Sequence, residues 1–401
     1  MKSEVRKEPF ALYFCIFILF LTSMGLWIGW NERAKYIYAF FSICMLILIK
    51  INHVKLNFTN RNKISFFLLI LAYTYITYKD EQLGFRTPFS FYLPIFVLLS
   101  IDTNDRIKCL DYIYKWYAWL LVPSIITYIL YQTIGLPSFG SLLVTDDIAL
   151  PTEYVTRENY IFYNYAEFYE IRFNGPFIEP GHLGMMSAFL LFATGFDFRK
   201  IYTWTILVGI LLTLSLSGYM LAFLGYALYQ YGEGKVGFKF FILAGLFTLI
   251  VLITALTYND GDNLFMEKII MRLEPDEENG FAGNNRVFGQ IDLYFVSLFT
   301  DFKLLLFGYD KETIEYLRES GSRGTGFIMW MVMHGLIGTI SAFLFYFSYS
   351  VMSKFRKISF LSFLFVLVVF WQRSYPFWFS WIICFTYGIS YHEYMFLKKR
   401  K

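Results

Sequence analysis

The chain has 401 residues, of which 57% are hydrophobic and 16% are charged. Soluble domains carry about 25% charged residues, so this composition excludes an ordinary soluble domain and indicates a polytopic membrane protein. The net charge of +4 and the absence of nucleotide-binding or metalloprotease motifs give no reason to expect a nucleic-acid partner or a cofactor. The four cysteines lie in or beside apolar runs without metal-ligand spacing, so we expect no metal site.

The apolar stretches predict the fold class. A spanning helix needs about 20 mainly apolar residues, and fewer where flanking Lys and Arg side chains reach the interface. Uncharged stretches lie at 10–30, 36–49, 64–78, 87–101, 116–145, 180–196, 201–232, 240–259, 324–353, 358–372 and 374–392. The 201–232 stretch is too long for one span, and we divide it at residues 215–218. The sequence therefore predicts a single all-α integral membrane domain with about twelve transmembrane helices.

The positions of Lys and Arg predict the orientation, because short cytoplasmic loops are enriched in them. With both termini in the cytoplasm, the inner segments hold 21 basic residues, against seven in the outer segments other than 259–323. All 35 basic residues then lie in loops. If 201–232 were one helix, the basic C-terminus would move outside, which the same rule disfavours.

Two long extracytoplasmic loops are expected, at 136–181 and 259–323. Inside the second, the apolar stretch 287–308 is interrupted by Asp292, Asp301 and Lys303. Another span at this point would invert every later helix. We therefore expect an interfacial helix that lies on the outer leaflet.

The segment "RFNGPFIEPGHLGMM" (172–186) closes the first long loop. Pro180 suits the first position of a helix, which makes Glu179 the N-cap and His182 a first-turn residue. Gly175 and Pro176 bend the chain, which could bring Arg172 over the helix end. Arginine and a helix N-terminus together can seat a pyrophosphate, and a carboxylate can deprotonate a sugar hydroxyl. An ordinary capped helix with a snorkelling arginine explains the same residues.

The other polar candidates share the expected outer mouth of the bundle: Arg373, Ser217, Arg286, Arg318 and Arg323. A solvated surface is the ordinary explanation for charged loop residues, and a polar turn is that for Ser217. Transporters keep ionisable groups near the bilayer midplane. His334 is the one internal candidate, and a hydrogen bond between helices explains it better than a proton relay. This asymmetry favours chemistry at the outer interface over transport.

Three blocks of the chain resemble Wzy-type polysaccharide polymerases, within the O-antigen polymerase and ligase superfamily. Arg172 to Pro180 matches the family's Arg-x-x-Gly-x-Phe-x-Glu-Pro segment, and "LSLSGYMLAFLGYALY" looks like its Ser-x-Ser helix start. "LLFGYDKETIEYLRESGSRGTGFIMWMVMHGLIGTI" resembles its closing pattern, a polar loop followed by a span with Gly-x-x-Gly. The blocks occur in the family's order over about residues 170–345.

The resemblance implies an inverting, metal-independent glycosyltransferase at the outer face of the bacterial cytoplasmic membrane. Undecaprenyl-pyrophosphate would be the leaving group, and the growing glycan would pass to a lipid-linked repeat unit. The family's loop arginines bind the pyrophosphate, which points to Arg172, Arg286 and Arg323, with Arg318 in the same loop. Glu179 or His182 would be the base. The implied partners are lipid-linked oligosaccharide and membrane lipids, and a chain-length regulator is left open.

Two alternatives remain. O-antigen ligases, which transfer glycan to lipid A–core, place a histidine about eleven residues before the Gly-x-x-Gly pair, where this chain has Gly324. A lipid-linked oligosaccharide flippase would need a cationic central cavity, whereas the predicted spans lack basic residues. The sequence therefore favours a polymerase of O antigen, capsule or exopolysaccharide.

Overall fold

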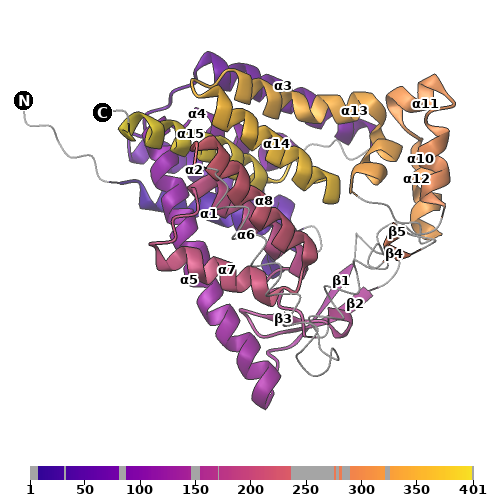
Figure 1. Ribbon diagram of the computed structural model, residues 1–401, viewed down its shortest axis with the longest axis horizontal. Helices are drawn as coiled ribbons and strands as arrows, with labels where there is room; N and C mark the ends of the chain where they lie inside the picture. The colour runs from indigo at the N-terminus through magenta and orange to yellow at the C-terminus, as the bar shows by residue number, and fades with distance from the viewer. Residues whose placement is uncertain are drawn as a thin grey trace, which may run out of the picture.

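The computed structural model describes residues 8–30, 33–80, 87–145, 154–169, 171–235, 275–276, 280–281, 290–320 and 326–399. This part of the chain is mainly helical (Figure 1). The α-helices are α1 (Phe10–Ser23), α2 (Arg33–Ile51), α3 (Asn60–Lys79), α4 (Leu93–Ser100), α5 (Thr103–Ile134), α6 (Pro180–Thr194), α7 (Ile201–Leu212), α8 (Leu216–Gly232), α10 (Ile291–Ser297), α11 (Phe302–Phe307), α12 (Lys311–Glu319), α13 (Gly326–Val351), α14 (Arg356–Gln372) and α15 (Phe379–Lys399). Two short 3-10 helices lie at Trp27–Gly29 (η1) and Glu167–Tyr169 (η3), and a short π-helix lies at Pro88–Tyr92 (η2).

Each predicted apolar stretch that falls on described residues contains a helix, and the stretch 240–259 lies outside those residues. In the described part of the chain, α2, α5 and α13 are long and apolar enough to cross a membrane. Shorter apolar helices lie at Phe10–Ser23, Pro88–Ser100 and Ile201–Leu212. The bundle thus agrees with an all-α membrane protein.

The 201–232 stretch is two helices, as predicted, and the break at residues 213–215 lies just before most of the predicted 215–218. Leu214 takes a positive φ of 44°, which ends α7, and the Ser215 side chain accepts a hydrogen bond from the Gly218 nitrogen at 3.3 Å, which caps α8. A Cβ atom on Gly218 would lie 3.1 Å from the Gly184 Cα atom. These two glycines therefore allow α6 and α8 to pack backbone against backbone.

Several predicted boundaries are wrong, and two of them have a clear local cause. The first apolar stretch continues to residue 30, but α1 ends at Ser23 because Gly25 turns the chain with a φ of 80°. Helix α5 begins at Thr103, well before the apolar stretch, because Asp102 caps it by accepting from the Asn104 nitrogen at 3.2 Å. Arg106 consequently lies inside a helix and is 1% exposed, so the expectation that all basic residues occupy loops is also wrong.

The first long loop contains a small sheet that the sequence analysis did not foresee. Strands β1 (Ser141–Thr145), β2 (Tyr154–Asn159) and β3 (Asn164–Tyr165) pair antiparallel in the order β1-β2-β3. In this register Leu142 lies opposite Arg157. A second pair, β4 (Pro275–Asp276) and β5 (Gly280–Phe281), lies in the other long loop.

The expected interfacial helix over 287–308 is divided into α10 and α11, as far as its residues are described. The division falls at Asp301, whose carboxylate accepts from the Lys303 nitrogen at 2.8 Å and starts α11. After α11, Tyr309 donates its backbone N–H to Val332 at 2.8 Å, next to the break of α13 at Gly335. These short helices therefore pack onto α13.

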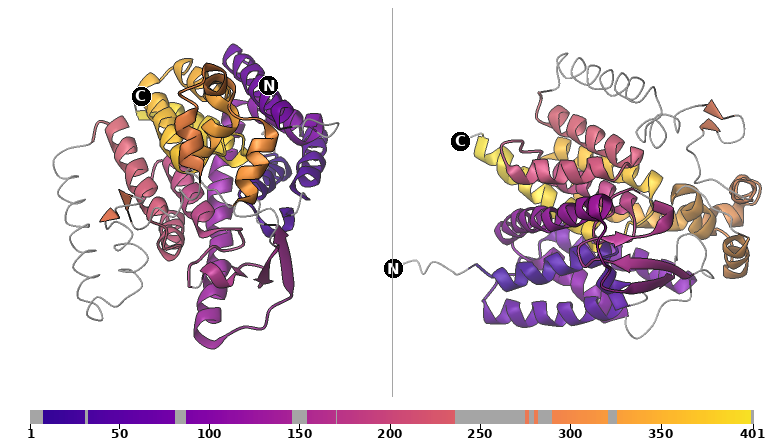
Figure 2. Two further views of the ribbon diagram at one scale, coloured as in Figure 1. Left: turned by 90° about the vertical axis from the view of Figure 1, so that its right-hand side faces the viewer. Right: turned by 90° about the horizontal axis from the view of Figure 1, so that it is seen from below.

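The two ends of the bundle differ in what they carry. The start of α1 and the end of α15 lie at one end (Figure 1), and the right-hand view of Figure 2 agrees. The sheet β1–β3 and helices α10–α12 lie at the opposite end in both views. The described elements of both long loops thus lie at the end of the bundle away from the termini.

Candidate functional site

Helix α6 begins as the sequence predicts. Glu179 is the N-cap residue with extended backbone (φ −142°, ψ 146°), and Pro180 occupies the first helical position. Proline is suited to this position because it has no N–H to leave unpaired and its φ is already helical. The Glu179 side chain makes no capping hydrogen bond. Its carboxylate is directed to a different partner.

That partner is Arg373, in the connection between α14 and α15. The Arg373 Nη2 atom donates to the Glu179 Oε2 atom, and the two side chains are 15% and 13% exposed. A Cβ atom on residue 181 would lie 2.5 Å from this Nη2 atom, so Gly181 leaves the space that the guanidinium occupies. Burial lowers the pKa of Arg373, but the charge of Glu179 and the hydrogen bond to it outweigh burial and raise that pKa. Arg373 therefore stays protonated.

His182 directly follows Gly181 in α6 and is 2% exposed. Its ring meets Tyr375 and Trp378 edge-on, with centroids 5.4 and 4.9 Å away. Those two rings stack on each other at 4.0 Å. Neither ring nitrogen makes a hydrogen bond of standard geometry, although the Met24 backbone is close enough to act on the ring. Aromatic packing therefore sets the orientation of the imidazole.

Arg157, on β2, is a member of this site that the sequence analysis did not name. It is 1% exposed and donates through Nη1 to the carbonyl oxygen of Ile178, directly before Glu179. The 136–181 loop has only two basic residues among seven acidic ones, and that scarcity is the signal that could have singled Arg157 out. Arg157, Arg373 and Glu179 are the charged side chains that act electrostatically on the His182 ring.

Arg172 and Ser217 share a second part of the site, at the turn between α7 and α8. The Arg172 Nε atom donates to the Thr213 carbonyl oxygen at 3.1 Å. The Ser217 hydroxyl lies 3.0 Å from that of Ser215. The sequence analysis expected Arg172 to fold over the start of α6, but the guanidinium packed against Gly181 belongs to Arg373. The reason is tertiary, since the connection after α14 reaches this helix end.

The remaining arginines come from the second long loop. Arg286 and Arg323 lie outside the described residues, and Arg318 belongs to α12.

Gly326, the first residue of α13, packs directly on the segment that carries Arg373. Its carbonyl oxygen accepts from the Ser374 hydroxyl at 2.7 Å, and a Cβ atom on it would lie 2.6 Å from the Ser374 nitrogen.

His334 lies between helices, where the sequence predicts a hydrogen bond, but its contact with the neighbouring helix is longer than a hydrogen bond. Its Nδ1 atom is 3.8 Å from the carboxylate of Asp80, just after α3, and its ring packs on Trp330 with centroids 4.5 Å apart. Because Asp80 follows α3 and His334 lies in α13, this contact links two helices.

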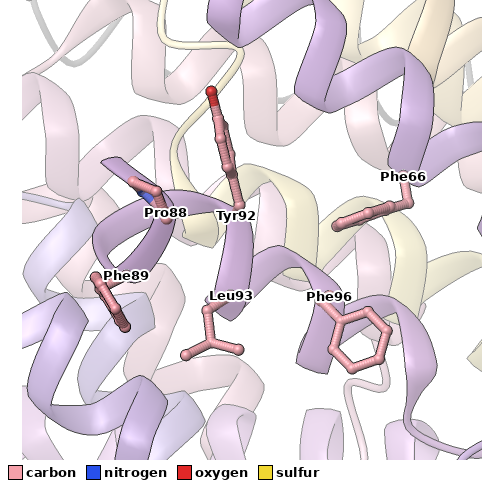
Figure 3. A pocket seen from close by; sticks show the side chains of 6 residues that line it. All are labelled: Phe66, Pro88, Phe89, Tyr92, Leu93 and Phe96. Atoms are coloured by element: carbon pink, nitrogen blue, oxygen red, sulfur yellow. The ribbon is translucent and has the colours of Figure 1, made fainter. Parts of the chain in front are cut away.

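A groove of about 320 Å³ opens beside α3 and the η2–α4 segment (Figure 3). Its lining consists of Phe66, Pro88, Phe89, Tyr92, Leu93 and Phe96. The Tyr92 hydroxyl is hydrogen-bonded to Thr74 at 2.7 Å. No charged side chain lines this groove, so it offers nothing for proton transfer or anion binding.

The start of α6 thus gathers one carboxylate, two guanidinium groups and an imidazole. Groups of this kind bind anions and transfer protons. Among the residues that the structure describes, no set of three or more His, Cys, Asp or Glu is arranged to hold a metal ion. Comparison of the chain with protein-family models, curated proteins and solved structures found no match.

Proposed function

We propose that this protein is a membrane glycosyltransferase that polymerises lipid-linked polysaccharide repeat units at the outer face of the bacterial cytoplasmic membrane. In this reaction the growing glycan leaves undecaprenyl-pyrophosphate and passes to an incoming lipid-linked unit. The observation that carries the proposal is the partly buried Glu179–Arg373 pair at the N-terminus of α6. It combines a base for a sugar hydroxyl with a cation for a pyrophosphate, in the segment that carries the family resemblance.

The chemistry follows from these two groups. The Glu179 carboxylate takes the proton of the acceptor hydroxyl while the hydroxyl oxygen attacks the anomeric carbon. The bond from that carbon to the pyrophosphate oxygen breaks, and the pyrophosphate leaves with the electron pair on the opposite face, so the configuration inverts. Arg373 stabilises the charge that develops on the leaving group.

The pair also explains how the base is prepared. Without donor, the Arg373 guanidinium pairs with the Glu179 carboxylate. When a pyrophosphate competes for the guanidinium, the carboxylate loses part of its cationic partner and becomes a stronger base. The base therefore becomes strongest once the donor is in place.

Glu179 is a better candidate for the base than His182. The Glu179 side chain is 13% exposed, whereas His182 is 2% exposed and packed edge-on against two aromatic rings. A general base must come within hydrogen-bond reach of the substrate proton. We assign His182 to shaping the site, and Arg172 to the outer end of the pyrophosphate beside the Ser217 turn. Arg286, Arg318 and Arg323 are proposed as further anion contacts from the second long loop.

A deletion strain tests the reaction. Without this protein, its surface glycan should carry single repeat units in place of a ladder on glycan gels. A plasmid-borne copy should restore the ladder, whereas the Glu179→Gln and Arg373→Gln variants should not. Glu393→Gln, which alters the ion pair of Glu393 with Arg61, is the matched control and should restore the ladder once expression is equalised. If Glu179→Gln and Arg373→Gln both restored full-length chains, the site assignment would be wrong.

The same strain separates the polymerase from the ligase. A polymerase defect leaves single units attached to their normal acceptor. If the deletion instead accumulated long lipid-linked chains without surface attachment, a ligase would replace the polymerase. With purified protein and lipid-linked repeat units, the rate should be unchanged by EDTA, as expected for a metal-independent transfer.

A further inference from the structure

The residue before Glu179 is fixed at both of its backbone polar atoms. The Ile178 nitrogen donates to the Gly25 carbonyl oxygen at 3.1 Å, and the Ile178 oxygen accepts from Arg157. The Trp30 indole donates to the same Gly25 oxygen at 2.8 Å, and its ring lies 5.5 Å from the Arg157 guanidinium carbon. Gly25, Trp30, Arg157 and Ile178 therefore form a closed ring of contacts, which we call the Ile178 clamp.

The clamp is built from three distant parts of the chain. Gly25 has a φ of 80°, and a Cβ atom there would lie 2.9 Å from the Ile178 Cγ2 atom. Both features require glycine, because an L side chain would be strained and would collide. Arg157 comes from β2, so the small sheet of the outer loop supplies the cation. The clamp thus connects the N-terminal turn, the outer loop and the start of α6.

Two aromatic rings hold the Arg157 guanidinium. Trp30 lies 5.5 Å from it and Tyr169 lies 5.2 Å from it, which are cation–π distances. A planar guanidinium packed between rings keeps its N–H groups in fixed directions, which a lysine ammonium cannot do. Tyr169 also acts electrostatically on Arg373, so it lies near both arginines of the site.

We propose that Arg157 is a positioning residue for Glu179. This inference rests on the proposed function, in which Glu179 is the base. By holding the Ile178 carbonyl, Arg157 fixes the peptide plane that leads into Glu179, and with it the direction of the carboxylate toward Arg373. Misplacing a reacting group by about 1 Å can cost about 100-fold in rate. Because Arg157 is 1% exposed, it acts through Glu179 and makes no contact with the substrate.

Steady-state kinetics of the purified protein on lipid-linked repeat units provide the test. Arg157→Lys keeps the charge but loses the flat, directed donors, so kcat should fall about 10- to 100-fold. The KM for the donor should change less than about threefold, because donor binding is left to Arg373. If Arg157→Lys instead raised the donor KM and left kcat unchanged, Arg157 would be a substrate contact and the proposal would be overturned.

Arg106→Lys is the matched control. Arg106 is also 1% exposed and donates to a backbone carbonyl, that of Ile101 at 2.8 Å, but it lies away from Glu179 at the start of α5. Its variant should reduce the yield or thermal stability of the protein and leave kcat of the folded fraction within about twofold. An equal loss of kcat in both variants would mean that any buried arginine matters in this way, which overturns the proposal.

Two further variants separate this inference from the proposed function. Glu179→Asp retains a displaced carboxylate and a measurable rate, so Arg157→Lys should slow it by less than it slows the wild type. Losses that multiply would show that Arg157 does not act through Glu179. If Glu179→Gln kept full activity, both the base assignment and the positioning role would fail. If Glu179→Gln were inactive but Arg157→Lys fully active, only the positioning role would fail.

Discussion

Arginine–glutamate pairs lie near both ends of α15, and their surroundings differ. Arg373 precedes this helix and pairs with Glu179, whereas Glu393 lies near its other end and pairs with Arg61 at 2.8 Å. The Glu393 carboxylate also accepts from the Ser353 hydroxyl at 2.6 Å and the Lys354 nitrogen at 3.3 Å. Arg61 in turn lies 4.4 Å from the ring centroid of Tyr349. The pair at Glu393 is thus tied into three segments of the bundle.

The pair at Glu179 has a different setting. It sits at a helix N-terminus, where free N–H groups favour anions. His182 lies beside it, with ring nitrogens that make no standard hydrogen bond. The comparison teaches that the same kind of ion pair can have two different roles. Where several internal donors share the carboxylate, we expect the pair to stabilise the fold, and where it adjoins a helix end and an imidazole, we propose that it takes part in the reaction.

The Glu179→Gln variant is the strongest test of the difference between the two ion pairs. We expect kcat to fall at least about 100-fold, because a positioned general base contributes on the order of 10²–10⁴ in rate. The melting temperature should fall less than in Glu393→Gln, because the Glu393 carboxylate also accepts from Ser353 and Lys354. Kinetics and thermal unfolding on the same preparation measure both. Unchanged kcat would remove the distinction between the two pairs.

Glu393→Gln should show the opposite pattern. Removing one partner of a largely buried ion pair costs on the order of 3 kcal/mol, and Ser353, Lys354 and Arg61 all lose their acceptor charge. We expect a lower melting temperature and lower yield, with kcat of the folded protein unchanged. Thermal unfolding in detergent provides the measurement. A fall in kcat without loss of stability would mean that this end also takes part in catalysis.

Gly181→Ala probes the space around Arg373. The new methyl group would collide with the guanidinium, so Arg373 must move away from the helix end. We expect the donor KM to rise about tenfold, because this is the cost of losing roughly one charge-assisted hydrogen bond. Gly234→Ala is a control, because a Cβ atom at Gly234 meets no atom within 4 Å, although its φ of 71° makes alanine strained there. Equal KM values for Gly181→Ala and the wild type would show that Arg373 does not bind the donor.

The smallest effect is expected for His182→Phe. Phenylalanine keeps the edge-on packing with Tyr375 and Trp378 and removes only the two nitrogens. If packing is the role of His182, kcat should fall by about threefold or less, close to the ordinary cost of a neutral core replacement. A loss of 100-fold or more would identify His182 as the base and return Glu179 to holding Arg373.

Local rules account for what the sequence could predict. The helix start at Glu179–Pro180 follows from proline chemistry and is predicted correctly. The division of 201–232 into two helices is also predicted, but the break lies at 213–215, and Ser215 caps α8. Apolar stretches located the helices because burial in lipid or protein selects the same residue types. Boundaries failed at Gly25 and Asp102, where a turn or a cap overrides hydropathy. Small sheets in polar loops leave no hydropathy signal at all.

By itself, then, the sequence determined an all-helical membrane-type bundle and the segment in which its polar residues gather. Only the tertiary structure decided which charges meet. Glu179 pairs with Arg373, 194 residues later in the chain. Arg157 donates to Ile178 from strand β2, where it lies opposite Leu142 of β1. No periodicity or motif encodes such pairings, because they depend on how helix ends and loops are brought together in space. The motif singles out Arg172, but the packing of α14 against α6 places Arg373, and not Arg172, beside the Glu179 carboxylate.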